Sequence, residues 1–102
     1  LPTYTMSRIY YGGIGLPRHL DRPSCEVSVT VNMWSDLVWP IYIETPDRRD
    51  VSAELQPGDA MVYKGSEAEH WRKPYQGDYC IQTFLHYVKT YGRQNSHFFD
   101  LA

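Results

Sequence analysis

Two histidines and an aspartate in this sequence could together bind a divalent metal ion. His19 and Asp21 are separated by one residue, and His70 follows much later in the chain. Residues two apart on an extended segment point to the same face, so His19 and Asp21 can reach one ion while the third ligand comes from elsewhere in the fold. Two imidazoles and a carboxylate, without a thiolate, suit iron(II) and leave coordination positions open for a cosubstrate and dioxygen. If the three residues converge, we expect a catalytic iron centre.

The elements that must position these residues are predicted to be β-strands. From Glu26 to Met33 the valines and the methionine take one face and the polar residues the other, which is typical of a half-buried strand. Further strands are predicted at Tyr4 to Tyr10, Trp39 to Glu44, Ser52 to Leu55, Asp59 to Lys64, Glu67 to Arg72 and Tyr79 to Val88. Segments rich in glycine, proline and aspartate separate them, and helical periodicity is absent. Such a pattern favours an all-β sandwich or small barrel, whose mouth is a natural ligand site.

Composition narrows the function classes. The 102 residues suit a single domain, and the net charge of −2 with interspersed acids and bases argues against nucleic-acid binding and favours a small-molecule or peptide substrate. Cys25 and Cys80 lack metal-finger spacing, so both are expected to be buried thiols. The three tryptophans are expected in the core or in a cavity wall. No apolar stretch is long enough for a membrane span and no signal-peptide pattern is present, so a soluble, cytoplasmic protein is the default expectation.

The surroundings of the His-x-Asp pair resemble the prolyl-hydroxylase-like branch of the iron(II)- and 2-oxoglutarate-dependent dioxygenases. In that family the signature reads Tyr-x-x-Gly-x-x-aromatic-x-x-His-x-Asp. It is matched here by Tyr10, Gly13, Leu16, His19 and Asp21, with leucine in place of the aromatic residue. The stretch Leu55 to Ala60 resembles the family's turn into the strand before the distal histidine, and His70 stands where that histidine is expected. The resemblance covers the chain from Tyr10 to about Tyr87.

The resemblance implies both a fold and an activity. The fold would be an all-β double-stranded β-helix, a jelly-roll or cupin-like barrel. We expect it to lack the family's N-terminal helical segment, as one domain over residues 1–102 that is a fragment of a longer protein. The activity would be hydroxylation of a small molecule or a peptidyl side chain such as proline, with 2-oxoglutarate converted to succinate and carbon dioxide and ascorbate as a reductant. His19, Asp21 and His70 would be the catalytic iron ligands, and Tyr10 would donate a hydrogen bond to 2-oxoglutarate.

One departure from the family concerns the far carboxylate of 2-oxoglutarate. Relatives place an arginine or lysine on the last strand, about ten residues after the distal histidine, whereas this chain has no basic residue there. A desolvated carboxylate needs a charged or multiply hydrogen-bonded partner. Arg72 is our substitute, because it lies two residues after His70 on the same strand face and can bind a carboxylate bidentately. The other candidates for this role are Arg22, Lys73 and Gln82.

Two other functions remain open from the sequence. The first is a cupin-type metalloenzyme that does not use 2-oxoglutarate, although the two closely spaced histidines of the first cupin motif are absent, since position 21 is an aspartate. The second is a non-catalytic jelly-roll binding module. His86 shares a strand face with Gln82 and Phe84 and is expected to be structural, while Glu67 and Glu69 are expected to be solvated. The oligomeric state is not indicated.

Overall fold

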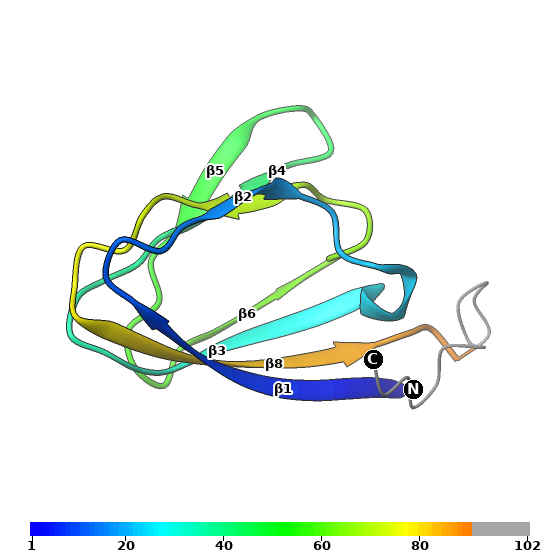
Figure 1. The fold of residues 1–102 in the computed structure, drawn as a ribbon. Coiled ribbons are helices and arrows are strands. Elements are labelled where there is room, and N and C mark those ends of the chain that lie inside the picture. Colours follow the sequence, from blue (N-terminus) through cyan, green and yellow to red (C-terminus); the bar gives the residue numbers. More distant parts are fainter. Residues whose placement is uncertain (91–102) are drawn as a thin grey trace.

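Two four-stranded antiparallel sheets face each other in the computed structural model, which describes residues 1–90. One sheet has the order β1-β8-β3-β6 and the other has the order β2-β7-β4-β5. Figure 1 shows β2, β4 and β5 in one layer and β1, β8, β3 and β6 in the other. The strands are β1 (Pro2–Tyr11), β2 (Leu16–His19), β3 (Val27–Ser35), β4 (Ile41–Glu44), β5 (Asp50–Ala53), β6 (Ala60–Tyr63), β7 (His70–Arg72) and β8 (Tyr79–Tyr87), with a 3-10 turn η1 at Pro23–Cys25. The predicted all-β jelly-roll architecture is confirmed.

The predicted strands are all present, with three differences. β2 was not predicted, because its four residues Leu16–His19 include Pro17 and show no alternation. β5 lies at Asp50–Ala53, two residues before its predicted position. β7 is confined to His70–Arg72, because Glu67 and Ala68 instead donate their amides to the Lys64 carbonyl in a turn.

The inward faces of the central strands are unusually polar. On β3 the buried side chains are Ser28, Thr30 and Asn32, while the valines of the same strand are only partly covered. β8 alternates in the same way, with Gln82 and His86 among its buried residues. Buried polar groups require hydrogen-bond partners and give a barrel interior the chemistry of a site rather than of a plain apolar core.

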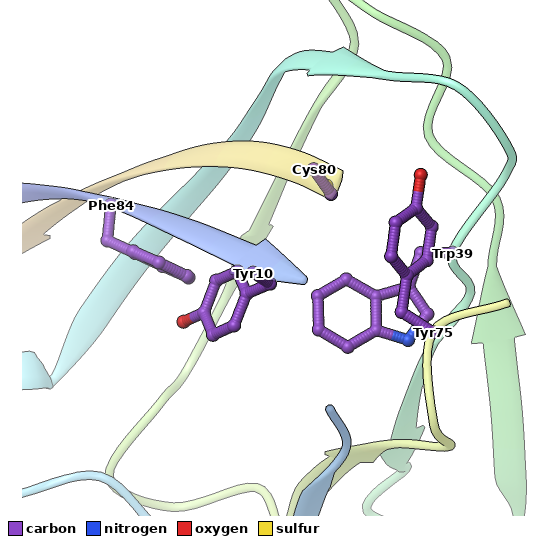
Figure 2. Close-up of a cluster of buried hydrophobic side chains, with 5 residues drawn as sticks. All are labelled: Tyr10, Trp39, Tyr75, Cys80 and Phe84. Atoms are coloured by element: carbon purple, nitrogen blue, oxygen red, sulfur yellow. The ribbon is translucent and has the colours of Figure 1, made fainter. Parts of the chain in front are cut away.

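An aromatic cluster fills one end of the space between the sheets. It consists of Tyr10, Trp39, Tyr75, Cys80 and Phe84 (Figure 2). Tyr10 meets Trp39 edge-on at a ring-centroid distance of 5.1 Å, and the Trp39 indole donates a hydrogen bond to the Lys73 carbonyl at 2.6 Å. These contacts fix Trp39 between the two sheets, where its carbonyl and its ring also contact Arg72.

The expectation for the tryptophans is correct for Trp39 only. Trp34 is 41% exposed and stacks on Tyr79, and Trp71 stacks on Tyr42 on the outer face of the β2-β7-β4-β5 sheet. Each has an aromatic neighbour, which explains how a large ring is accommodated outside the core. Cys25 and Cys80 are both buried free thiols, as predicted. Among the described residues, no helix is long and apolar enough to cross a membrane.

Candidate metal centre

Pairing of β2 with β7 brings the two predicted histidine ligands together. His19 and His70 are direct cross-strand partners, and their ring centroids lie 4.4 Å apart. Asp21 follows the end of β2, where its amide donates to the Gly65 carbonyl at 2.8 Å. Its Oδ1 lies 3.4 Å from His19 Nε2 and 3.3 Å from His70 Nε2. The three ligand atoms all lie within 4.8 Å of one another, so one ion can reach all of them.

Hydrogen bonds to backbone carbonyls orient both imidazoles. His19 Nδ1 lies 2.6 Å from the Pro17 carbonyl, and His70 Nδ1 lies 2.8 Å from the Ala68 carbonyl. A carbonyl only accepts, so each Nδ1 carries a hydrogen and each neutral ring presents its lone pair at Nε2, the atom that faces Asp21. Burial lowers the pKa of His70, but the hydrogen bonds that the protonated ring donates to Asp21 and Ala68 outweigh that effect and raise the pKa overall. The donor set is therefore preorganised for a cation.

Gly65 provides the space that Asp21 occupies. A Cβ atom at this position would lie 2.4 Å from Asp21 Oδ2, 2.7 Å from Ser28 Oγ and 2.9 Å from the Cys25 carbonyl oxygen. No side chain fits at such distances, so the carboxylate can take this position only beside a glycine. In the sequence Gly65 is simply part of a turn, and nothing there indicates its contact with Asp21.

The three residues line a cavity of about 190 Å³ between the sheets. Alternate side chains of β1 form one of its walls, and Leu16, Ile41 and Phe84 add apolar surface. The residues contributed by β1 are Tyr4, Met6, Arg8 and Tyr10. Arg72, Tyr63 and His86 also line it. The cavity thus combines a cluster of metal ligands with the guanidinium groups of Arg8 and Arg72 and with phenol hydroxyls, which suits a small anionic ligand next to a metal.

Arg72 is held inside this cavity and has an unused donor group. It is 4% exposed, its Nη1 donates to the Trp39 carbonyl at 2.8 Å, and its guanidinium carbon lies 4.7 Å from the centre of the Trp39 ring. Nη2 is buried and has no hydrogen-bond partner among the described residues, and no acid there pairs with the guanidinium. Burial lowers the pKa of Arg72. A desolvated cation with a free donor is a favourable binding partner for a carboxylate.

The remaining predicted cosubstrate residues divide into those inside and those outside the cavity. Tyr10 lines it, and its hydroxyl, which points away from the Trp39 indole in Figure 2, has no hydrogen-bond partner among the described residues. Gln82 is buried but does not line the cavity, because it accepts from Thr30 and donates to Cys80 Sγ. Two more of the predicted candidates lie outside the cavity lining: Lys73, whose ammonium lies over the Tyr42 ring, and Arg22, which donates to Ser24 Oγ.

Residues that the sequence reasoning missed complete the cavity. Tyr63 packs edge-on against His70 with ring centroids 4.9 Å apart, and burial together with the charge of Asp21 raises the pKa of its hydroxyl. Tyr4 on β1 lines the cavity, and so does His86, which was expected to be structural. Alternation placed each of them on a strand, but no spacing in the sequence links them to the metal ligands.

Comparisons with known proteins agree on the fold. No protein-family model matches the sequence, and no significant match is found among curated proteins. Among solved structures, a prolyl-4-hydroxylase from Pseudomonas putida matches with a TM-score of 0.64 and 20% identity, over 83% of this chain and 50% of that chain. The fold is that of the cupin-type double-stranded β-helix.

Two cupin domains are also similar to this double-stranded β-helix. A cupin domain from Bordetella pertussis Tohama I matches with a TM-score of 0.52 and 16% identity, over 83% of this chain and 80% of that one. A Cupin_2 domain of an XRE-family transcriptional regulator from Enterobacter cloacae matches with a TM-score of 0.55 and 12% identity, over 87% of this chain and 95% of that chain. Fold alone therefore does not separate an oxygenase from other cupins, and the distinction depends on the residues of the site.

Proposed function

We propose that this double-stranded β-helix is an iron(II)- and 2-oxoglutarate-dependent oxygenase that hydroxylates a small molecule or a peptidyl side chain, with succinate and carbon dioxide as co-products. The observation that supports this most is the pairing, within one cavity, of the His19, Asp21 and His70 ligand set with the buried, unpaired Nη2 of Arg72. A site for a metal alone does not need a desolvated guanidinium. A site for a metal and a dicarboxylate cosubstrate does.

Each cavity residue has a role in this proposal. His19, Asp21 and His70 would hold the iron, which when bound supplies the activation of dioxygen needed to oxidise a C–H bond. Arg72 would bind the far carboxylate of 2-oxoglutarate, kept in orientation by its hydrogen bond to the Trp39 carbonyl. The Tyr10 hydroxyl would donate a further hydrogen bond to the cosubstrate. Apolar side chains such as those of Leu16 and Phe84 would exclude water from the reacting groups.

The main competitor is a cupin-type metalloenzyme that does not use 2-oxoglutarate. Such an enzyme could use the same three ligands, and two cupin domains share this fold. The Arg72 side chain favours the oxygenase, because leaving a guanidinium donor buried without a partner costs free energy that an anionic cosubstrate would recover. A non-catalytic module would have no need for either feature.

Succinate formation tests the proposal directly. The purified chain is incubated with iron(II), 2-oxoglutarate, ascorbate and oxygen, and succinate is measured for the wild type and for His19→Ala. We expect turnover of 2-oxoglutarate in the wild type, uncoupled from any prime substrate, and its loss in the variant. Absence of succinate, or equal amounts from both proteins, would contradict the oxygenase function.

Arg72→Gln distinguishes the cosubstrate from the metal. Removing one partner of a buried charged pair costs about 2 to 5 kcal/mol, so 2-oxoglutarate should bind at least roughly thirtyfold more weakly while iron is still bound. Binding can be followed anaerobically by the visible charge-transfer absorption of the iron and 2-oxoglutarate complex. Lys73→Gln is the matched control, because it removes the adjacent positive charge, which lies outside the cavity. Equal affinity in the Arg72 and Lys73 variants would exclude Arg72 as the anchor.

A further inference from the structure

A second set of metal-ligating atoms lies next to the first and shares one residue with it. Ligand atoms of Asp21, Cys25 and His86 also lie within 4.8 Å of one another. Cys25 is 1% exposed and His86 4% exposed, so both ligands are removed from bulk water. Cys25 is the last residue of η1 and His86 lies on β8. The set therefore joins the segment after β2 to the β1-β8-β3-β6 sheet. The oxygenase proposal uses neither Cys25 nor His86.

The hydrogen bonds around His86 leave its Nε2 free to bind a cation. His86 Nδ1 lies 2.7 Å from Ser28 Oγ, and Ser28 Oγ also lies 3.4 Å from the Cys25 carbonyl oxygen, to which its hydroxyl can donate. In the tautomer in which Nδ1 donates to Ser28 Oγ, the lone pair of the neutral ring lies on Nε2. A hydrogen bond at Nδ1 likewise orients His19 and His70, and it is typical of metal-binding histidines.

Cys25, unlike Cys80, lies among other candidate ligand atoms and beside a phenol hydroxyl. Cys25 Sγ lies 3.1 Å from the Tyr4 hydroxyl, which can donate a hydrogen bond to a metal-bound thiolate, and the Tyr4 ring lies 4.5 Å from the ring of His86. Cys80 is equally buried, but it accepts from Gln82 and belongs to no group of ligand atoms among the described residues. The two cysteines are therefore chemically different, although the sequence gives no sign of it.

We propose that Asp21, Cys25 and His86 form a second metal site, selective for thiophilic divalent cations of which zinc is the type. A thiolate, an imidazole and a carboxylate are ordinary zinc ligands, whereas iron(II) is better matched by the set without sulfur. Since Asp21 belongs to both sets, a cation bound to Cys25 and His86 competes with iron for its carboxylate. This site does not depend on the oxygenase function, because it requires neither 2-oxoglutarate nor oxygen.

Cobalt(II) is the probe, because a cobalt–thiolate bond gives an intense near-ultraviolet charge-transfer band. Metal-free protein is titrated anaerobically with cobalt(II) in the presence of a phosphine reductant, and zinc is then added to displace it. The decisive protein is Cys80→Ser, in which Cys25 is the only cysteine left. We expect the wild type and Cys80→Ser to show the band with equal intensity, and zinc to abolish it.

Variants of the other ligands separate the two sites. His86→Gln in the Cys80→Ser background should lose the band, whereas His19→Ala, which disrupts only the first site, should keep it. Asp21→Asn should weaken cobalt binding at both sites. A folded Cys80→Ser protein without the band, or a band that survives in folded His86→Gln, would overturn the second site. Near-ultraviolet circular dichroism of the buried aromatic cluster verifies folding in each case. Because no succinate is measured, this outcome is independent of the oxygenase test.

Discussion

At the scale of single residues, Asp21 is the side chain that the two groups of candidate metal ligands share. Its amide is bound by Gly65, its Oδ1 faces both His19 and His70, and it belongs to the set with Cys25 and His86. A carboxylate with so many roles needs a fixed position. The fixing element is a residue without a side chain, since Gly65 both accepts from the Asp21 amide and leaves room for its Oδ2.

Gly65→Ala should therefore reduce metal affinity. The new methyl group would lie 2.4 Å from Asp21 Oδ2, so the carboxylate must leave the position from which its Oδ1 contacts both histidines. We expect a loss of stability of about 1 to 3 kcal/mol from overpacking, together with weaker binding of iron(II) or manganese(II). Denaturant unfolding measures the first effect and calorimetric metal titration the second.

Gly58→Ala is the control for the general effect of replacing a glycine on stability. Gly58 has a φ of +93° and open space around a Cβ, so alanine there strains the chain without touching the site. A cost of about 1 kcal/mol or more is expected, with metal affinity unchanged. If the Gly65 variant also kept full affinity, the contact with Asp21 would not be what positions the carboxylate.

The residue-level predictions from sequence were strongest where a motif or strand parity applied. His19, Asp21 and His70 converge as the motif implied, and Arg72 shares the inward face of β7 with His70 as the two-residue spacing required. Parity gives a side chain's face on its own strand but not which strands lie opposite. For that reason Cys25, Tyr63 and Gly65 could not be connected to the site in advance.

At the scale of elements, the alternation of apolar and polar residues located the strands, but it did not show which face of each strand is buried. The valines of β3 share one face, as the alternation indicated, but it is the other face, with Ser28, Thr30 and Asn32, that points inward. A strand whose inner neighbours are a cavity and hydrogen-bonding side chains can bury its polar face. β2 escaped prediction for another reason: its pairing with β7 arises from tertiary contact and not from its own four residues.

One link between elements is predicted to be sensitive to pH. Asp36, just after β3, accepts a hydrogen bond from the buried Tyr75 hydroxyl and another at 2.7 Å from the Asp78 amide, and the hydrogen bond from Tyr75 is the main reason its pKa is lowered. A pKa below the unfolded value contributes stability above the unfolded pKa, and that contribution is lost as the pH falls through the folded pKa. Asp36 thus stabilises the fold at neutral pH and ceases to do so in acid.

Asp36→Asn should reveal this dependence. The difference in the free energy of unfolding between wild type and variant should be largest near neutral pH and should shrink below about pH 4, where the carboxyl group of the unfolded chain is protonated. Tyr75→Phe keeps the buried ring and removes the hydroxyl, so it should reduce the same pH dependence. The measurement is denaturant unfolding across a pH series. A difference that stays constant with pH would show that the carboxylate charge is not the stabilising feature.

At the scale of the whole molecule, metal binding and folding stability are linked. A cation at His19, Asp21 and His70 binds the folded chain, whose β2 and β7 must be paired, and has no comparable site in the unfolded chain. At a free metal concentration about a hundred times the dissociation constant, the gain is about 2.7 kcal/mol. For a domain of this size that corresponds to a rise in melting temperature of roughly 10 °C or more.

Thermal unfolding with and without manganese(II), a redox-stable substitute for iron(II), measures this gain. His70→Ala should lose the metal-dependent rise, whatever its own effect on the melting temperature. Glu67→Gln serves as the control, because it removes a nearby exposed acid that is outside the ligand set and should keep the full rise. An equal rise in His70→Ala would place the cation elsewhere.

The cross-strand pair of His19 and His70 also bears on the order of events in folding. β2 and β7 are distant in sequence, and closing the long loop between them costs entropy that only the finished sheets recover. We therefore expect the ligand set to form late, after the rate-limiting barrier. A metal ion would leave the folding rate nearly unchanged and would slow unfolding, because it stabilises contacts that the transition state has not yet made. A bound ion would thus keep a folded barrel from opening and would not help the barrel to form.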